Sequence, residues 1–191
     1  MLVGYGKGAL AMIDPATRKK IADFDLKGHP EGFQIADTRT QVFVNVPDLH
    51  QIQIVDLMSG VVRSLPTDPL RANFPMAIDR EAHRVLIVFR SPPTLVALSS
   101  PDEKIVAKQE TCGDADDVFV DAKRHRVYVA CGAGQVDVFE ERAASYQRIG
   151  QVGTAPGART ALFVPEVDRL FVAVRAAGQE PAAVWVFRPV P

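Results

Sequence analysis

Apolar residues gather in short runs along the whole chain, and four of these runs recur at a nearly constant interval. The runs begin at Val42, Val85, Val127 and Leu170, so that their starts lie 43, 42 and 43 residues apart. A fixed period of this size is typical of an array of small β-sheets. The pattern therefore predicts a repeat of about 42 residues.

Each repeat contains four such runs of β-branched and aromatic residues, separated by Gly, Pro, Asp or Asn. In one unit they occupy 30–37, 41–46, 51–57 and 61–65. Runs of this length and composition, bounded by turn residues, indicate antiparallel strands and hairpins. Four strands per unit in series predict an all-β protein, a β-propeller of four-stranded antiparallel blades. A β-sandwich does not explain similar sequence at every fourth strand, and a parallel β-helix has shorter repeats.

The array is predicted to open and close in mid-blade. The 191 residues form a single propeller segment, in which three full blades stand between two partial ones. The two partial blades overlap in two strands, so we expect an incomplete ring and a natural chain that extends N-terminally, or a fragment. Unpaired strand edges predict self-association of this chain. The predicted partial blades are 1–28 and 154–191, and the full blades are 29–70, 71–112 and 113–153.

Composition and charge exclude several function classes. The chain is 47% hydrophobic and 24% charged, which is ordinary for a globular protein, and its formal net charge is −1. Lys and Arg are not in excess over Asp and Glu, so the charge does not favour nucleic acid as a partner. No stretch is apolar enough for a membrane span, and residues 1–5 lack the charged and then apolar start of a signal peptide.

Loops that lead into the first strand of each blade carry the polar residues of most interest. In a propeller the first strands line the central channel, and these loops surround one of its openings. Asp114, Asp116 and Asp117 form the densest group, and as an alternative to a solvated acidic loop their oxygens suit Ca²⁺ or Mg²⁺. We otherwise expect no cofactor, metal or catalytic residue. The candidate ligand-binding residues are His29, Glu31, Asn73, Asp114, Asp116, Asp117, Arg159 and Thr160.

Two cysteines complete the candidate chemistry. Cys112 ends an outer strand and Cys131 ends the second strand of the next blade, and both lie toward the same face in the predicted scheme. A disulfide between them is geometrically feasible and would suit an exported protein. Two buried free thiols are the interpretation that we favour.

The chain resembles the YVTN-repeat or YncE-like β-propellers of bacteria. The resemblance covers essentially the whole chain and rests on the segments 3–14, 28–33, 72–77, 113–119 and 154–159. It implies a seven-bladed propeller that is exported to the periplasm or secreted, with upstream blades and a signal peptide missing here. Members of this family are not generally enzymes.

These observations predict a non-catalytic scaffold that binds a protein or a small molecule at the loop-lined channel opening. The alternative is a propeller enzyme, similar to a lactonase or a quinoprotein, whose site is completed by missing blades. No His–carboxylate constellation or cofactor motif in the sequence favours that alternative, although the fold alone does not decide function.

Overall fold

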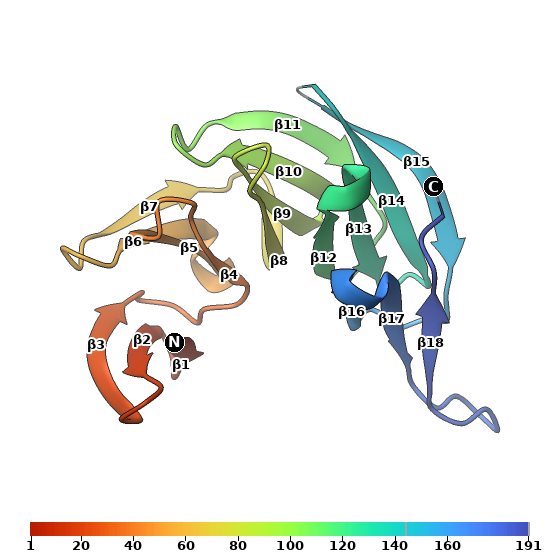
Figure 1. Cartoon of the computed structure of the whole chain (residues 1–191), viewed down its shortest axis with the longest axis horizontal. Helices are drawn as coiled ribbons and strands as arrows, with labels where there is room; N and C mark the ends of the chain where they lie inside the picture. Colours follow the sequence, from red (N-terminus) through yellow and green to blue (C-terminus); the bar gives the residue numbers. More distant parts are fainter. Residues whose placement is uncertain (144, 191) are drawn as a thin grey trace.

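The strands of the protein form five antiparallel sheets that follow one another along an arc (Figure 1). The computed structural model describes residues 1–143 and 145–190. In every sheet the spatial order of the strands is their order in the chain, which is the result of successive hairpins. The three central sheets have four strands each and the two terminal sheets have three. The predicted three full and two partial blades are therefore confirmed.

The first sheet contains β1 (Leu2–Tyr5), β2 (Ala9–Asp14) and β3 (Lys19–Asp25). The second contains β4 (Phe33–Ile35), β5 (Gln41–Val46), β6 (Gln51–Asp56) and β7 (Val62–Pro66). The third contains β8 (Arg71–Asp79), β9 (Arg84–Ser91), β10 (Pro93–Ser99) and β11 (Ile105–Glu110). The fourth contains β12 (Ala115–Asp121), β13 (Arg126–Cys131), β14 (Gln135–Arg142) and β15 (Ser145–Gly153). The fifth contains β16 (Ala161–Val164), β17 (Arg169–Val174) and β18 (Ala183–Phe187).

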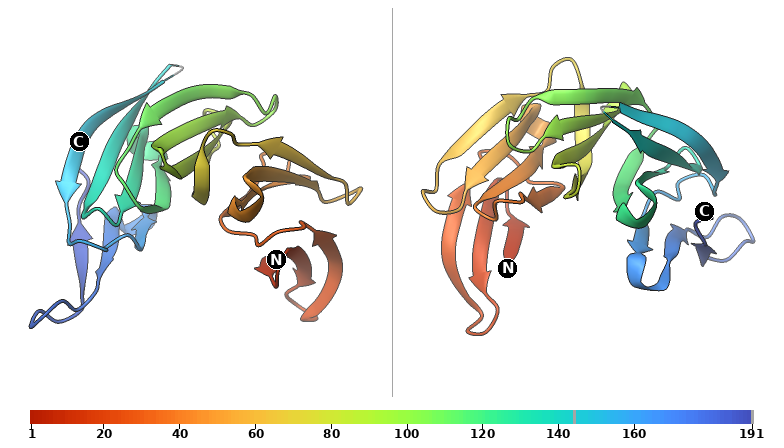
Figure 2. Two further views of the ribbon diagram at one scale, coloured as in Figure 1. Left: turned by 180° about the vertical axis from the view of Figure 1, so that it is seen from behind. Right: turned by 45° about the horizontal axis from the view of Figure 1, so that its top comes forward.

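The sheets are arranged radially, as in a propeller. Strands β4, β8, β12 and β16 lie on the concave side of the arc, whereas β7, β11 and β15 lie on its outer side (Figures 1 and 2). Within the described residues the first and fifth sheets do not meet, so the arc stays open. The structure is thus an incomplete β-propeller, as the repeat predicts.

The hydrophobic core is divided among the junctions between neighbouring sheets. Phe43 and Ile54 of the second sheet pack against Ile87 of the third, and Leu86 of the third packs with Val129 of the fourth. All five side chains have an exposed fraction of 1% or less. Burial of each such side chain stabilises the fold by about 1.5–3 kcal/mol. Alternation along each strand therefore places one apolar set on each face of a blade.

The turns between first and second strands hold the blades together on one face of the arc. Two of these turns form short 3₁₀ helices, η2 (Ala122–Arg124) and η3 (Pro165–Val167). The other 3₁₀ helix of the described residues, η1 (Pro47–Leu49), lies elsewhere, between the second and third strands of its blade, β5 and β6. Arg124 of η2 reaches the next turn and donates to Asp168 at 2.7 and 2.8 Å. These contacts tie successive repeats by charge as well as by apolar packing.

The innermost strand of the second sheet is shorter than the sequence predicts. Only Phe33–Ile35 is paired as β4, although the apolar run extends over 30–37. Gly32 instead donates its backbone N–H to the carbonyl oxygen of Phe74 in the third sheet at 3.0 Å. A Cβ atom on Gly32 would lie 2.5 Å from that oxygen, so glycine is required for this approach. The carbonyl oxygen of Gly32 also accepts the backbone N–H of Asn45 in β5 at 2.9 Å, so Gly32 links its own blade to the next one.

None of the helical segments among the described residues is long and apolar enough to cross a membrane.

Candidate functional site

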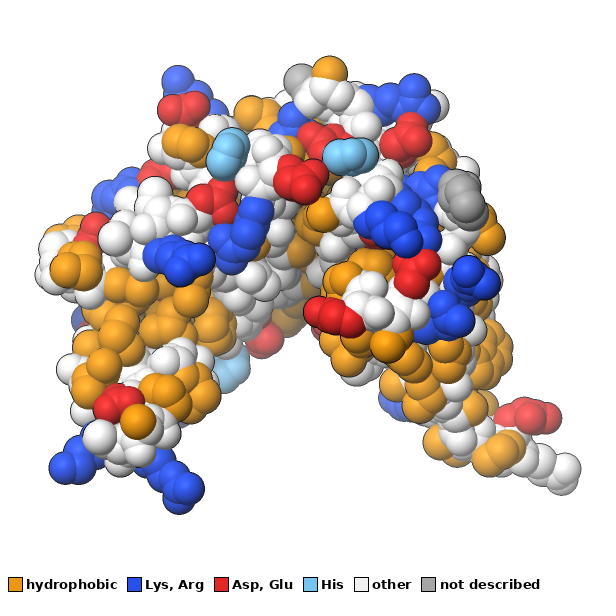
Figure 3. Space-filling view, viewed as in Figure 1, with side chains coloured by type: hydrophobic (Ala, Val, Ile, Leu, Met, Phe, Trp, Pro, Cys, Tyr) orange, Lys and Arg blue, Asp and Glu red, His pale blue; other side chains and the backbone are white. Residues whose placement is uncertain are grey.

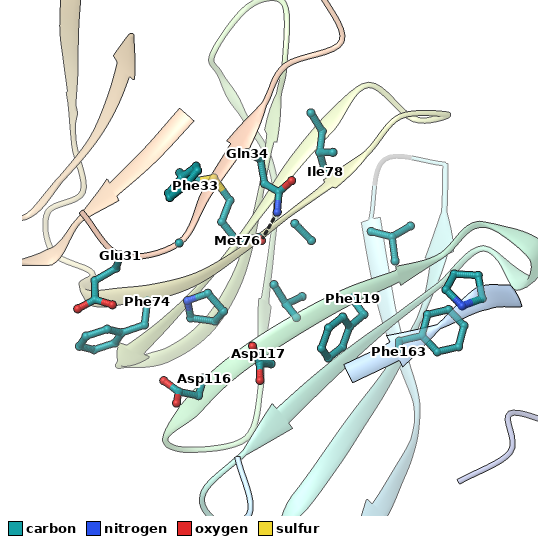
Figure 4. Close-up of a pocket in the computed structure, with 16 residues that line it drawn as sticks. Glu31, Phe33, Gln34, Phe74, Met76, Ile78, Asp116, Asp117, Phe119 and Phe163 are labelled. Atoms are coloured by element: carbon teal, nitrogen blue, oxygen red, sulfur yellow. Dashed lines mark hydrogen bonds between the residues drawn. The ribbon is translucent and has the colours of Figure 1, made fainter. Parts of the chain in front are cut away.

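The concave side of the arc contains a groove of about 610 Å³. Its walls come from the innermost strands and from the loops that lead into them (Figure 4). Aromatic and apolar side chains dominate the walls, and three carboxylates stand among them. The side chains that define the groove are Glu31, Phe33, Phe74, Met76, Asp116, Asp117, Phe119 and Phe163.

Two arginines from different blades hold the carboxylates of Asp114, in the loop before β12, and of Asp116, near the start of β12. Arg159 places Nη1 at 2.6 Å from Asp114 Oδ2 and Nε at 3.4 Å from Asp116 Oδ2. Arg90, at the end of β9, forms ion pairs with the same two aspartates. The hydrogen bond from Arg159 to Asp114 raises the pKa of the arginine. Asp114 and Asp116 therefore form an inter-blade ion-pair cluster with Arg90 and Arg159, which we call the mouth cluster.

Packing fixes Arg90 in this cluster. Its Nε donates to the carbonyl oxygen of Ala115 at 2.7 Å, and its guanidinium carbon lies 4.1 Å from the centre of the Phe74 ring. A cation over an aromatic face is attractive and also keeps the ring in place. A bulge between Ala115 and Asp117 in β12 provides the register for these contacts.

The loop of the mouth cluster is anchored by a disulfide between Cys112 and Cys131. Their Cα atoms are 5.9 Å apart, and the bond joins the end of the third sheet to β13. The interpretation that we favoured from the sequence, two buried free thiols, is therefore wrong. It failed because hydrophobic patterning shows that both residues are buried but not that their Cβ atoms face each other across the blade junction.

Asp117 differs from its two neighbours. Its Oδ2 accepts the backbone N–H of Ala161 at 2.8 Å, so it bridges β12 to β16. Burial raises the pKa of Asp117, and the nearby charge of Asp116 acts in the same direction, whereas the Ala161 hydrogen bond acts against them. No ion pair of Asp117 is present among the described residues, so its charge is available to the groove.

The remaining predicted residues separate into three environments. Glu31 lines the groove, while His29 is exposed and its Nδ1 lies 2.9 Å from the carbonyl oxygen of Gly6. Asn73 is fully buried, and its Nδ2 donates to Asn45 Oδ1 and to the carbonyl of Gln51, both at 3.0 Å. Thr160 is exposed beside Arg159. The structure thus places Glu31, Asp116 and Asp117 along the same groove, but turns Asn73 into the blade packing.

Two of the three aspartates are already neutralised by arginine. Among the residues that the structure describes, no three His, Cys, Asp or Glu side chains come together as a metal-binding group. The mouth cluster has equal numbers of positive and negative side chains, which is the arrangement of a salt-bridge network rather than of a Ca²⁺ or Mg²⁺ shell. The residues present do not fit the metal alternative.

Sequence reasoning missed Arg90 and the aromatic walls of the groove. Arg90 ends a second strand, away from the loops that the sequence pattern singles out, and it reaches the mouth only because β9 continues to Ser91. Phe74 lies within an irregular stretch of β8, where the pairing register shifts between Asn73 and Met76. Such a shift alters the side of the strand on which the following side chains lie. A signal for Arg90 exists in the repeat, because Arg175 occupies the same position two blades later.

Comparison with known proteins supports the fold alone. No family model matches the chain, and no curated protein matches it by sequence. A chain in a crystal structure of the mitotic checkpoint complex superposes with a TM-score of 0.83 at 12% identity, covering 98% of this chain and 59% of that one. A functionally unknown protein from Desulfotomaculum acetoxidans gives 0.73 at 14% identity, covering 90% and 57%.

A third similar structure is the dihydro-heme d1 dehydrogenase NirN in complex with DHE, with a TM-score of 0.71 and 16% identity, covering 95% of this chain and 42% of that one. This protein therefore spans between about two fifths and three fifths of these chains. At such identities the likeness shows a β-propeller scaffold and nothing about activity. Membership of the YVTN-repeat family stays a prediction.

Proposed function

We propose that the protein is a non-catalytic binding scaffold and that its concave groove takes a ligand that is apolar and positively charged. A short segment of a partner protein that combines Lys or Arg with aromatic or aliphatic residues has this chemistry. The proposal keeps the binding role and the loop-lined location that the sequence predicts, and it adds the walls of the groove.

One observation carries the proposal: the carboxylates of Glu31 and Asp117 face a groove with aromatic walls, while their acidic neighbours are paired. Asp114 and Asp116 have Arg90 and Arg159 as partners. The charge of the groove itself is therefore negative. Its mixture of apolar walls and few polar groups is typical of binding sites.

The charge and the walls favour the same occupant. A cation near an unpaired, partly buried carboxylate gains more than it does at an open surface, because fewer waters screen the attraction. The ring of Phe119 offers apolar contact and a face for a cation, whereas Phe74, over which Arg90 already lies, adds apolar contact. An anionic ligand would instead meet Glu31 and Asp117 without a free arginine to offset them.

A peptide selection tests this proposal. The intact chain is immobilised and a random peptide library displayed on phage is panned against it, with Glu31→Arg as the matched groove variant. We expect the recovered peptides to combine basic and apolar residues and to bind Glu31→Arg about tenfold more weakly, which corresponds to ~1.4 kcal/mol. Glu81→Arg is the control, because Glu81 is an exposed glutamate in a turn between first and second strands.

Two outcomes would contradict the proposal. Peptides that bind the Glu31→Arg variant as tightly as the unmodified chain would place the contact elsewhere. Thermal stabilisation that requires both Ca²⁺ and a sugar lactone, followed by turnover of the lactone, would favour the enzyme alternative.

A further inference from the structure

The second and third sheets pack together around a small cavity near their outer strands. Its volume is about 180 Å³. Both sheets are complete four-stranded blades, so the cavity does not result from the open ends of the arc. Exposed hydrophobic side chains gather instead on the two limbs of the arc (Figure 3). We call this space the junction cavity, and its apolar walls are the side chains of Ile52, Leu65, Leu70, Phe89, Val96 and Leu98.

The junction cavity is present because the aromatic side chains that fill the next junction are missing from this one. Phe139 lies opposite Val127 in the fourth sheet as Leu98 lies opposite Val85 in the third, so the two side chains occupy the same place in their blades. Phe139 is fully buried against the third sheet, together with Tyr146 of the outer strand β15. In the third sheet Leu98 is smaller, and the outer strand β11 contains no aromatic residue. The space that two rings fill in one junction is therefore left open in the other.

The walls of the junction cavity suit an apolar molecule of limited size. Phe89 and Val96 are each 2% exposed, and the hydroxyl of Thr67, which also lines the space, donates to the carbonyl oxygen of Leu70 at 3.1 Å. This hydroxyl therefore already has an acceptor within the protein. A cavity of about 150 Å³ with aliphatic and aromatic walls stays dry and holds a benzene-sized molecule, so a chain of about six carbons matches the junction cavity.

The rim of the junction cavity carries three charged side chains, two of which are paired. Glu103 accepts hydrogen bonds from both Nη atoms of Arg63 across the junction, and the Nη1 to Oε2 distance is 2.7 Å. Asp68 forms an ion pair with Arg71. Lys108 of β11 also lines the space, and no ion pair of Lys108 occurs within residues 1–143 and 145–190. The charge that the rim leaves without a partner is therefore positive.

We propose that the junction cavity binds a small aliphatic monocarboxylic acid, with its hydrocarbon chain against the apolar walls and its carboxylate on Lys108. Burial of the chain removes apolar surface from water, and the ammonium group forms a charge-assisted hydrogen bond with the carboxylate. The concave groove leaves negative charges unpaired, whereas this rim leaves a positive one. The two sites therefore select opposite ligand charges, and this proposal does not depend on the ligand assigned to the groove.

Hexanoate and hexanol together test the proposal, because they share a chain length and differ in charge. The intact, isotope-labelled chain is titrated with each compound while the amide chemical shifts are recorded. We expect the largest shifts with hexanoate at Leu65, Leu98 and Lys108. Hexanol should bind at the same place about tenfold more weakly, since it cannot form the charge-assisted hydrogen bond.

Lysine variants test the head group. Lys108→Ala should weaken the binding of hexanoate about tenfold and leave the binding of hexanol unchanged, because only the acid uses the ammonium group. Lys104→Ala is the matched control. Lys104 is an exposed lysine that precedes the same strand and does not line the junction cavity, so its removal should affect neither compound.

A filling substitution tests the walls. Leu98→Phe introduces here the ring that Phe139 supplies at the next junction. It should abolish the binding of both compounds and raise the melting temperature by several degrees, because a filled cavity regains packing contacts. Lys108→Ala keeps the proposal testable if Leu98→Phe does not fold, since Lys108 is exposed and its removal leaves the core intact.

Three results would overturn the proposal. The first is a set of hexanoate shifts centred on Glu31 and Asp117 in the groove. The second is equal affinity of the unmodified chain for hexanoate and hexanol. The third is a folded Leu98→Phe variant that binds hexanoate as tightly as the unmodified chain.

Discussion

On both faces of the arc, ion pairs between Asp and Arg hold neighbouring blades together, but the two sets of ion pairs differ in how far they are buried. In the mouth cluster, Asp114, Asp116 and Arg159 keep between 35% and 42% of their side-chain surface exposed, and Arg90 keeps 20%. On the opposite face, Arg124 pairs with Asp121 and Asp168, and these three side chains are 11%, 2% and 25% exposed. Tyr128 also donates its hydroxyl to Asp121 at 2.6 Å. We call this second group the turn cluster.

The difference separates a structural network from one beside the groove that we propose to bind a ligand. Buried ion pairs are strongly coupled to the fold, because loss of one partner leaves a charge without water or counter-ion. Exposed pairs contribute little to stability and can exchange partners. The mouth loop is instead held by the Cys112–Cys131 disulfide, so its position depends less on its ion pairs.

The largest effect is expected at Asp121. Asp121→Ala removes the acceptor of Arg124 and Tyr128, and we expect the free energy of unfolding to fall by about 4 kcal/mol. Urea denaturation measures this change. Tyr128→Phe is the graded control and should cost about 1 kcal/mol, because it removes one hydrogen bond but no charge. A loss below 1 kcal/mol for Asp121→Ala would remove the distinction between the two clusters.

Removal of the disulfide should rank second. The double variant Cys112→Ala/Cys131→Ala opens a loop with a sequence separation of 19, and we expect a loss of about 3 kcal/mol. Hydrogen exchange should show the loss of protection first at residues 112–117, where the mouth loop loses its anchor. Equal exchange in the turn cluster would show that the anchor is not local.

A substitution in the mouth cluster should have a small effect on stability. We expect Asp116→Asn to change the free energy of unfolding by less than about 1 kcal/mol, since its carboxylate is about one third exposed and solvent screens the pair. Urea denaturation of Asp116→Asn and of Asp121→Ala under the same conditions compares the two losses of unfolding free energy. A loss as large as that of Asp121→Ala would contradict the account of the mouth.

The smallest effects are opposite pH dependences of two aspartates. Burial raises the pKa of Asp117, so the folded state holds its proton more tightly, and this residue makes the protein more stable as pH falls from the raised pKa toward the ordinary Asp value. The hydrogen bond from Arg124 lowers the pKa of Asp168, so its stabilisation is present above the ordinary Asp value and is lost as pH falls through the lowered one.

Stability curves of Asp117→Asn and Asp168→Asn, each subtracted from that of the unmodified protein, isolate these contributions. The two difference curves should have slopes of opposite sign in acid. Slopes of the same sign would show that the two carboxyls do not differ in environment.

The sequence predicts the blades because the same pattern of apolar runs occurs in each of them. It does not predict contacts that depend on how two neighbouring blades are aligned. The runs at Val42, Val85, Val127 and Leu170 are independent observations of one strand, so that errors at single positions do not matter. Asn73 has no such support, and a bulge beside it decides that its side chain is buried. The pairing of Cys112 with Cys131 likewise depends on how two sheets pack, which periodicity does not encode.

The central claim is that recognition occurs in the groove beside the mouth cluster and not at the turn cluster. Amide chemical-shift mapping of the intact chain with a basic, apolar peptide recovered by selection tests it most directly. The account predicts that the largest shifts fall on Glu31, Phe74 and Asp117, and that they disappear in Glu31→Arg. Shifts centred on Arg124 and Asp168, or on β17 and β18, would contradict it.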